Sequence, residues 1–96
     1  MFDVELLPQA EHELAEVFDW YEEQLAGLGN KFYKELDHYF TAISKNPHHY
    51  PIKYKGDLHF VVLNKFPYLI IYWVDKINNL IIVVSIFHTS REPKRL

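Results

Sequence analysis

The side chains best suited to chemistry flank two apolar runs in the second half of the chain. Lys65 and Tyr68 stand at the start of the first run, and His88, Ser90 and Arg91 follow the second. If the runs pair as antiparallel strands, the start of one lies beside the end of the other, so these side chains can converge. A histidine among basic groups can transfer a proton near neutral pH and stabilise a phosphodiester transition state. Such a site would cleave RNA without a metal ion, using the 2′-hydroxyl as nucleophile.

Two interpretations of these residues stay open. In the enzyme hypothesis Lys65, His88 and Arg91 form the catalytic set, and the additional phosphate or base contacts come from Tyr68, Tyr72 and Ser90. Aromatic rings there could stack on RNA bases. In the alternative, the two tyrosines are core residues whose hydroxyl groups reach water, and the residues after the second run only finish a strand.

Other kinds of site have little support. The chain has no cysteine, and its three glycines form no phosphate-binding loop. Its six histidines include no pair at metal-ligand spacing. The sequence therefore predicts no metal ion and no cofactor.

Length and composition predict a single domain over residues 1–96. Hydrophobic residues make up 49% of the 96 positions, which is too apolar for a disordered chain. The N-terminal residues lack the pattern of a signal peptide, and both apolar runs are shorter than the ~18 residues that span a bilayer. We therefore expect a cytoplasmic protein that does not contact a membrane.

The net charge of −3 conceals an uneven distribution. Residues 1–30 contain eight acidic residues and no Lys or Arg, whereas residues 31–96 contain ten basic and five acidic residues. The first segment should repel phosphate groups and the second could attract them. Both could equally be solvated surfaces.

The two apolar runs predict a β-hairpin. Residues 66–74 and 80–87 are rich in β-branched and aromatic side chains and flank the polar turn 75–79. Polar residues do not alternate with apolar ones in either run, as they would in a strand with one solvated face. We therefore expect a central hairpin with both faces covered.

The preceding residues predict a strand and two helices. Residues 2–7 alternate as in a short strand, and Pro8 suits the first turn of a helix. Apolar residues recur at spacings of three and four up to Leu25 and again from about residue 30 to Asn46, with glycines between. The short connection predicts an antiparallel helical hairpin. Residues 52–54 could be extended, and residues 58–63 read as a strand.

The order β-α-α-β-β-β predicts an α+β fold in which the helical hairpin packs on one face of a mainly antiparallel sheet. The other face should also be apolar, and an uncovered apolar face usually marks a partner site. The partner would be another protein or a second copy of this chain. We assign this surface to Tyr72, Val74, Ile82 and Val84.

In their order and spacing, these segments resemble the ParE/RelE superfamily of toxins from bacterial type II toxin–antitoxin systems, in particular its ParE-like, plasmid stabilization branch. The resemblance extends over the full chain. Its most specific parts are the block Phe66-Pro67-Tyr68 and the ending His88-x-x-Arg91-x-Pro93. Residues 18–22, Phe32 with Leu36, and Asn46-Pro47 also match the pattern.

The resemblance implies growth inhibition, and neutralisation by a cognate antitoxin whose flexible segment folds around the apolar face. ParE-like members bind DNA gyrase and stall it, whereas RelE-like members cut messenger RNA in the ribosome. Ribosome-dependent nucleases tend to be strongly basic, unlike this chain. Lys65 stands where nucleases often present an arginine, and lysine lacks the bidentate fork. We therefore expect a gyrase-binding toxin, with an mRNA endoribonuclease or a toxin fold without toxicity as alternatives.

Overall fold

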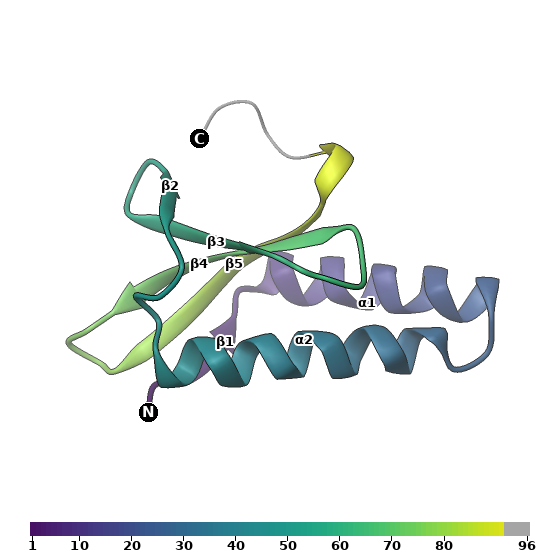
Figure 1. The fold of residues 1–96 in the computed structure, drawn as a ribbon, viewed down its shortest axis with the longest axis horizontal. Helices are drawn as coiled ribbons and strands as arrows, with labels where there is room; N and C mark the ends of the chain where they lie inside the picture. The colour runs from purple at the N-terminus through teal and green to yellow at the C-terminus, as the bar shows by residue number, and fades with distance from the viewer. Residues whose placement is uncertain (92–96) are drawn as a thin grey trace.

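The computed structural model describes residues 1–91, apart from the side chains of residues 54 and 91. It contains two helices and five strands, with both helices on the same side of the sheet (Figure 1). The elements are β1 (Asp3–Leu6), α1 (Pro8–Gln24), α2 (Leu28–Lys45), β2 (Ile52–Tyr54), β3 (Leu58–Val62), β4 (Tyr68–Asp75), β5 (Leu80–His88) and the 3₁₀ turn η1 (Thr89–Arg91).

The sheet has the strand order β1-β5-β4-β3-β2. β1 pairs with β5 in parallel, and the remaining neighbours are antiparallel. The predicted α+β fold and the central position of the β4–β5 hairpin are both confirmed. The short strand β2 at the edge adds one element to the predicted β-α-α-β-β-β order, at the segment that the sequence marked as extended.

The helical hairpin is closed by a glycine turn and a glutamate. Gly27 has a φ of +90°, a backbone conformation that glycine adopts without strain, and α2 begins one residue later. Glu22 of α1 accepts hydrogen bonds from the backbone N–H groups of Gly27 at 3.2 Å and Gly29 at 2.8 Å. These bonds satisfy donors that the first turn of a helix leaves free, so α2 begins two residues earlier than predicted.

The main core lies between the helices and the sheet. Four aromatic rings meet there edge to face or tilted, with centroids 5.1 to 5.5 Å apart for the pairs Tyr21–Phe66, Phe32–Phe66, Phe32–Tyr68 and Tyr21–Phe32. Such pairs contribute about 0.5–1.5 kcal/mol each beyond the area they bury. This cluster holds the start of β4 against both helices.

The opposite side of the sheet, which we call the open face, carries a second apolar cluster. Leu69 and Ile71 are buried at its centre, surrounded by the half-buried side chains of Leu58, Phe60, Val84 and Phe87. Neither helix packs on this side (Figure 1). The prediction of an apolar second face is therefore confirmed.

Two residues assigned to this face from the sequence lie on the other one. Tyr72 is fully buried and Val74 half-buried, and both pack in the core beneath the helices. Because successive side chains of a strand point to opposite faces, their neighbours Ile71 and Trp73 face outward instead. The other two predicted partner residues lie on the open face. Val84 belongs to the open-face cluster, and Ile82 is the cross-strand partner of the outward-facing Trp73.

Candidate functional site

The ends of β4 and β5 bring together three of the residues singled out from the sequence. Tyr68 and His88 are direct cross-strand partners, with ring centroids 5.0 Å apart in an edge-to-face arrangement. Nδ1 of His88 accepts a hydrogen bond from the Ser90 backbone N–H at 3.2 Å, and the Ser90 hydroxyl lies 2.7 Å from the same nitrogen. Because a backbone N–H only donates, the neutral His88 ring carries its proton on Nε2. The predicted proximity of these strand ends is confirmed.

Lys65 lies in a different depression. It lines a groove along α2, which we call the lysine groove, together with Lys31, Lys34, Glu35, His38, Tyr39, Asn64 and Phe66. Its backbone N–H donates to Oε2 of Glu35 at 2.6 Å, which fixes the turn before β4 against α2. His88 does not line this groove, and a shared site of Lys65 and His88 stays a prediction. The side chain of Arg91 and all of residues 92–96 lie outside that part.

His88 instead lines a pocket of about 700 Å³ between α1 and the strand ends, which we call the α1 pocket. Its lining residues are Glu13, Glu16, Val17, Trp20, Tyr21, Pro67, Tyr68, Ile86, Phe87 and His88. Two carboxylates and several aromatic rings line it, and no Lys or Arg is among its described residues. A pocket of this composition attracts cations and repels phosphate groups.

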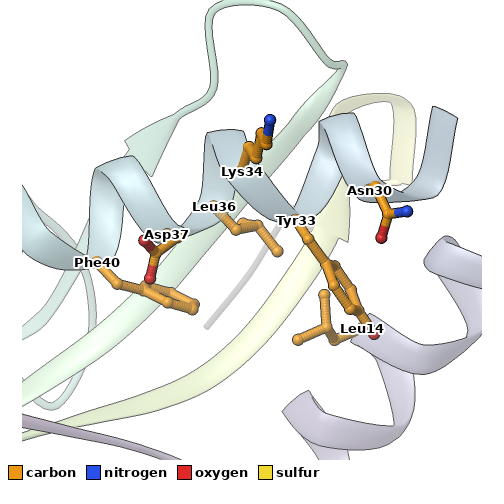
Figure 2. A pocket seen from close by; sticks show the side chains of 7 residues that line it. All are labelled: Leu14, Asn30, Tyr33, Lys34, Leu36, Asp37 and Phe40. Atoms are coloured by element: carbon orange, nitrogen blue, oxygen red, sulfur yellow. The ribbon is translucent and has the colours of Figure 1, made fainter. Parts of the chain in front are cut away.

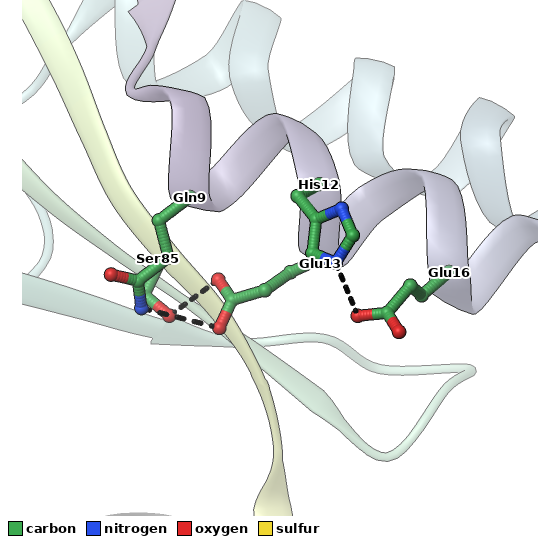
Figure 3. A network of polar contacts seen from close by, with 5 residues as sticks. All are labelled: Gln9, His12, Glu13, Glu16 and Ser85. Carbon is green, nitrogen blue, oxygen red and sulfur yellow. Dashed lines mark hydrogen bonds and ion pairs between the residues drawn. The ribbon is translucent and has the colours of Figure 1, made fainter.

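Glu13 reaches from α1 to an irregular point of the sheet (Figure 3). The register of β4 and β5 shifts there, leaving Val84 as one extra residue in β5. Oε1 of Glu13 accepts hydrogen bonds from the Ser85 hydroxyl at 2.7 Å and the Ile86 backbone N–H at 3.0 Å. Oε2 lies 3.5 Å from the side-chain amide of Gln9. Glu13 therefore satisfies one backbone donor next to the bulge and the buried hydroxyl of Ser85.

The sequence did not single out Glu13, although two signals pointed to it. It lies next to the buried stripe of α1, between Ala10 and Val17. Ser85 is the only polar residue in the apolar run 80–87, and it is almost completely buried. A buried hydroxyl needs a hydrogen-bond partner, and a carboxylate on the facing helix supplies one.

Tyr72 has a structural role that excludes the predicted contact with nucleic acid. Its ring stacks on His59 with centroids 5.0 Å apart, and its hydroxyl donates to the Pro47 carbonyl oxygen at 2.6 Å. Burial, with a smaller effect of Tyr50, raises the pKa of Tyr72 far above its ordinary value of 10.0. Tyr72 is therefore a neutral donor in the core, as the alternative interpretation expected, but its hydroxyl bonds Pro47 and does not reach water as that interpretation also expected.

A sequence model of one family spans nearly the whole chain. The model describes the ParE toxin of the type II toxin–antitoxin system parDE, and it matches residues 4–93.

The chain belongs to the ParE toxin family.

No protein of curated function matches the sequence. Among solved structures, the chromosomal ParDE toxin–antitoxin system of P. aeruginosa is similar with a TM-score of 0.76 and 13% identity, over 92% of this chain and 96% of that chain. The isolated E. coli RelE toxin gives a TM-score of 0.72 and 15% identity, over 96% and 88% of the two chains. The intact E. coli RelBE toxin–antitoxin complex gives a TM-score of 0.69 and 17% identity, over 90% of this chain and 94% of that chain. At these identities the likeness shows a common fold.

This ParE-family toxin has a third depression, between its two helices. It is lined by Leu14, Asn30, Tyr33, Lys34, Leu36, Asp37 and Phe40 (Figure 2). The rings of Tyr33 and Phe40 extend from α2 toward α1, with Leu14 opposite Tyr33. The groove is apolar at its base and polar at its rim, as protein-binding grooves usually are.

No group of three His, Asp or Glu side chains among the described residues could hold a metal ion. Neither α1 nor α2 is long and apolar enough to cross a membrane.

Proposed function

We propose that this toxin arrests growth by binding a target protein, with DNA gyrase as the first target to test, and that a cognate antitoxin neutralises it in the cytoplasm. The observation that supports the proposal is that Lys65 and His88 line different depressions. A nuclease needs cationic groups around the proton donor to stabilise the charged transition state. The described surroundings of His88 are acidic and aromatic instead.

The surfaces of the molecule suit protein partners. The open face presents an apolar cluster, and the groove on the helical hairpin has an apolar base. Removing exposed apolar surface of this kind from water, by packing it against a partner, is favourable by about 25 cal/mol of transfer free energy per Å². We assign the open face to the antitoxin and the helical hairpin to the target. A second copy of the toxin is the competing occupant of the open face. A plasmid or chromosomal segment that encodes both the toxin and its antitoxin would then be stably inherited.

A supercoiling assay with purified gyrase and relaxed plasmid tests the proposal. The wild-type toxin should inhibit supercoiling, and His88→Ala should inhibit equally, because His88 has no catalytic role in this mechanism. Tyr33→Lys, which places a charge in the helical groove, should weaken inhibition about tenfold or more. Glu23→Lys, at an exposed position of α1 outside that groove, is the matched control. Full supercoiling at every toxin concentration would remove gyrase as the target.

The ribosome-dependent nuclease is the second candidate, and the arrangement of His88, Tyr68 and Ser90 is what favours it. In its imidazolium form, His88 could give its Nε2 proton to a leaving oxygen and become neutral imidazole. In that mechanism His88→Ala abolishes toxicity while the protein stays folded. A toxin without any growth effect in its host would instead fit the third alternative, a fold that retains only antitoxin binding.

A further inference from the structure

The α1 pocket has the chemistry of a receptor for a guanidinium group. Its first component is a carboxylate that is already held in place. The two hydrogen bonds to Oε1 fix Glu13 against β5, whereas Oε2 has only the 3.5 Å contact with Gln9 among the described residues (Figure 3). A fixed carboxylate with a free oxygen can accept a charged donor without losing side-chain entropy on binding.

The second component is an exposed aromatic wall. Trp20 is 55% exposed although it is a large apolar side chain, and its ring meets Tyr21 edge to face at 5.2 Å. An indole face attracts cations, most of all the flat guanidinium group of arginine. Glu16 lies one turn of α1 before Trp20, and among the described residues it pairs with the exposed His12, whose Nε2 lies 3.3 Å from Oε1 of Glu16. Such an exposed pair is weak and can reorganise.

The third component is the connection between this pocket and the open face. Phe87 lines the α1 pocket and also belongs to the open-face cluster. Phe87 thus connects the lining of the pocket with the open face on which a partner would pack. No Lys or Arg among the described lining residues neutralises the two carboxylates, so the pocket can accept a cation from a partner.

We propose that the α1 pocket binds an arginine side chain of the antitoxin, between the Trp20 ring and the carboxylates of Glu13 and Glu16. The inference rests on the proposed neutralisation by an antitoxin. Arginine fits better than lysine, because its planar fork can bond a carboxylate and stack on an indole at the same time. The pocket thus supplies charge specificity to an interface whose remaining contacts are apolar.

The test uses N-acetyl-L-argininamide as the probe and N-acetyl-L-citrullinamide as its uncharged analogue. In the NMR spectrum of the purified toxin, the arginine probe should shift the indole N–H signal of Trp20 to saturation, and the citrulline analogue should not. Glu16→Gln should weaken binding of the arginine probe about tenfold. Glu23→Gln, on the same helix outside the pocket, should leave the affinity unchanged. Equal shifts with both probes, or no saturable shift, would overturn the proposal.

Two further arms identify the occupant. The purified cognate antitoxin should displace the probe from the pocket, and simultaneous binding of both would contradict the assignment to the antitoxin. If the probe binds only to the Arg91→Ala variant, the chain's own arginine is the occupant and the proposal fails. Probe binding is measured on the purified toxin, so its outcome is independent of whether the protein inhibits gyrase or growth.

Discussion

At the scale of single residues, Glu13 links the first helix to the last strand. Glu13→Ala would leave the Ser85 hydroxyl and the Ile86 N–H without their carboxylate acceptor. Ser85 is only 2% exposed, so water cannot readily replace the carboxylate. We expect a loss of about 2–4 kcal/mol in the free energy of unfolding, measured by urea titration. Glu13→Gln keeps an acceptor and should lose about 1 kcal/mol. A Glu13→Ala protein as stable as Glu23→Ala would contradict this role.

Tyr72 gives a prediction about alkaline pH. Burial raises the pKa of Tyr72 above its ordinary value of 10.0, so the folded protein keeps the phenolic proton that the unfolded chain loses. The stabilisation is complete below pH 10.0 and is lost progressively as the pH rises above it. The urea midpoint should therefore fall with pH in that range. Tyr72→Phe should reduce this fall and, by removing the hydrogen bond to Pro47, cost about 1 kcal/mol at neutral pH. Equal slopes in both proteins would contradict the argument.

At the scale of elements, the helical hairpin depends on a close approach at Gly29. A Cβ atom built there would lie 2.6 Å from a ring carbon of Phe18. We expect Gly29→Ala to destabilise the protein by about 1–3 kcal/mol in thermal or urea unfolding, because a ring in the helix interface has to move. Gly27→Ala tests backbone strain instead, since nothing lies within 4 Å of the added atom but φ is +90°. Gly27→Ala should lower the free energy of unfolding by about 1 kcal/mol. Full stability of Gly29→Ala would show that the helices are less tightly packed.

The elements also show what could be predicted from the sequence. The helices follow from apolar spacing at three and four residues, and the β4–β5 hairpin follows from two apolar runs around a polar turn. The sequence did not show which side chains of that hairpin point to which face, because a run that is apolar at every position has no alternation of polar and apolar residues. Tyr72 and Val74 were therefore assigned to the wrong side. The bulge at Val84 gave no sequence signal apart from Ser85, so the convergence of Glu13 on β5 was missed as well.

At the scale of the whole molecule, the open face should carry the antitoxin. Val62 is 49% exposed, and its pairing with Leu69 places it on the open face. Val62→Lys should leave the stability of the free toxin nearly unchanged but weaken antitoxin binding about tenfold or more. Ile77→Lys is the matched control, because Ile77 is 94% exposed at the tip of the β4–β5 turn. Calorimetric titration with the antitoxin measures the difference. Equal affinities of the two variants would move the antitoxin to another surface.

Charge is distributed unevenly between two depressions of the molecule. The α1 pocket contains two carboxylates, and the lysine groove on the other helix contains three lysines. Groups of opposite charge on separate faces orient approaching partners and increase association rates at low salt. The net charge of −3 alone would hide this arrangement.

The central claim is that growth arrest follows from binding a protein and not from cutting RNA. It is tested most directly by mapping the 5′ ends of a translated reporter transcript before and after the toxin is induced without an antitoxin. The wild-type toxin and His88→Ala should both arrest growth and leave the transcript intact. New 5′ ends within codons that appear with the wild-type toxin and disappear with His88→Ala would contradict the account and establish an endoribonuclease.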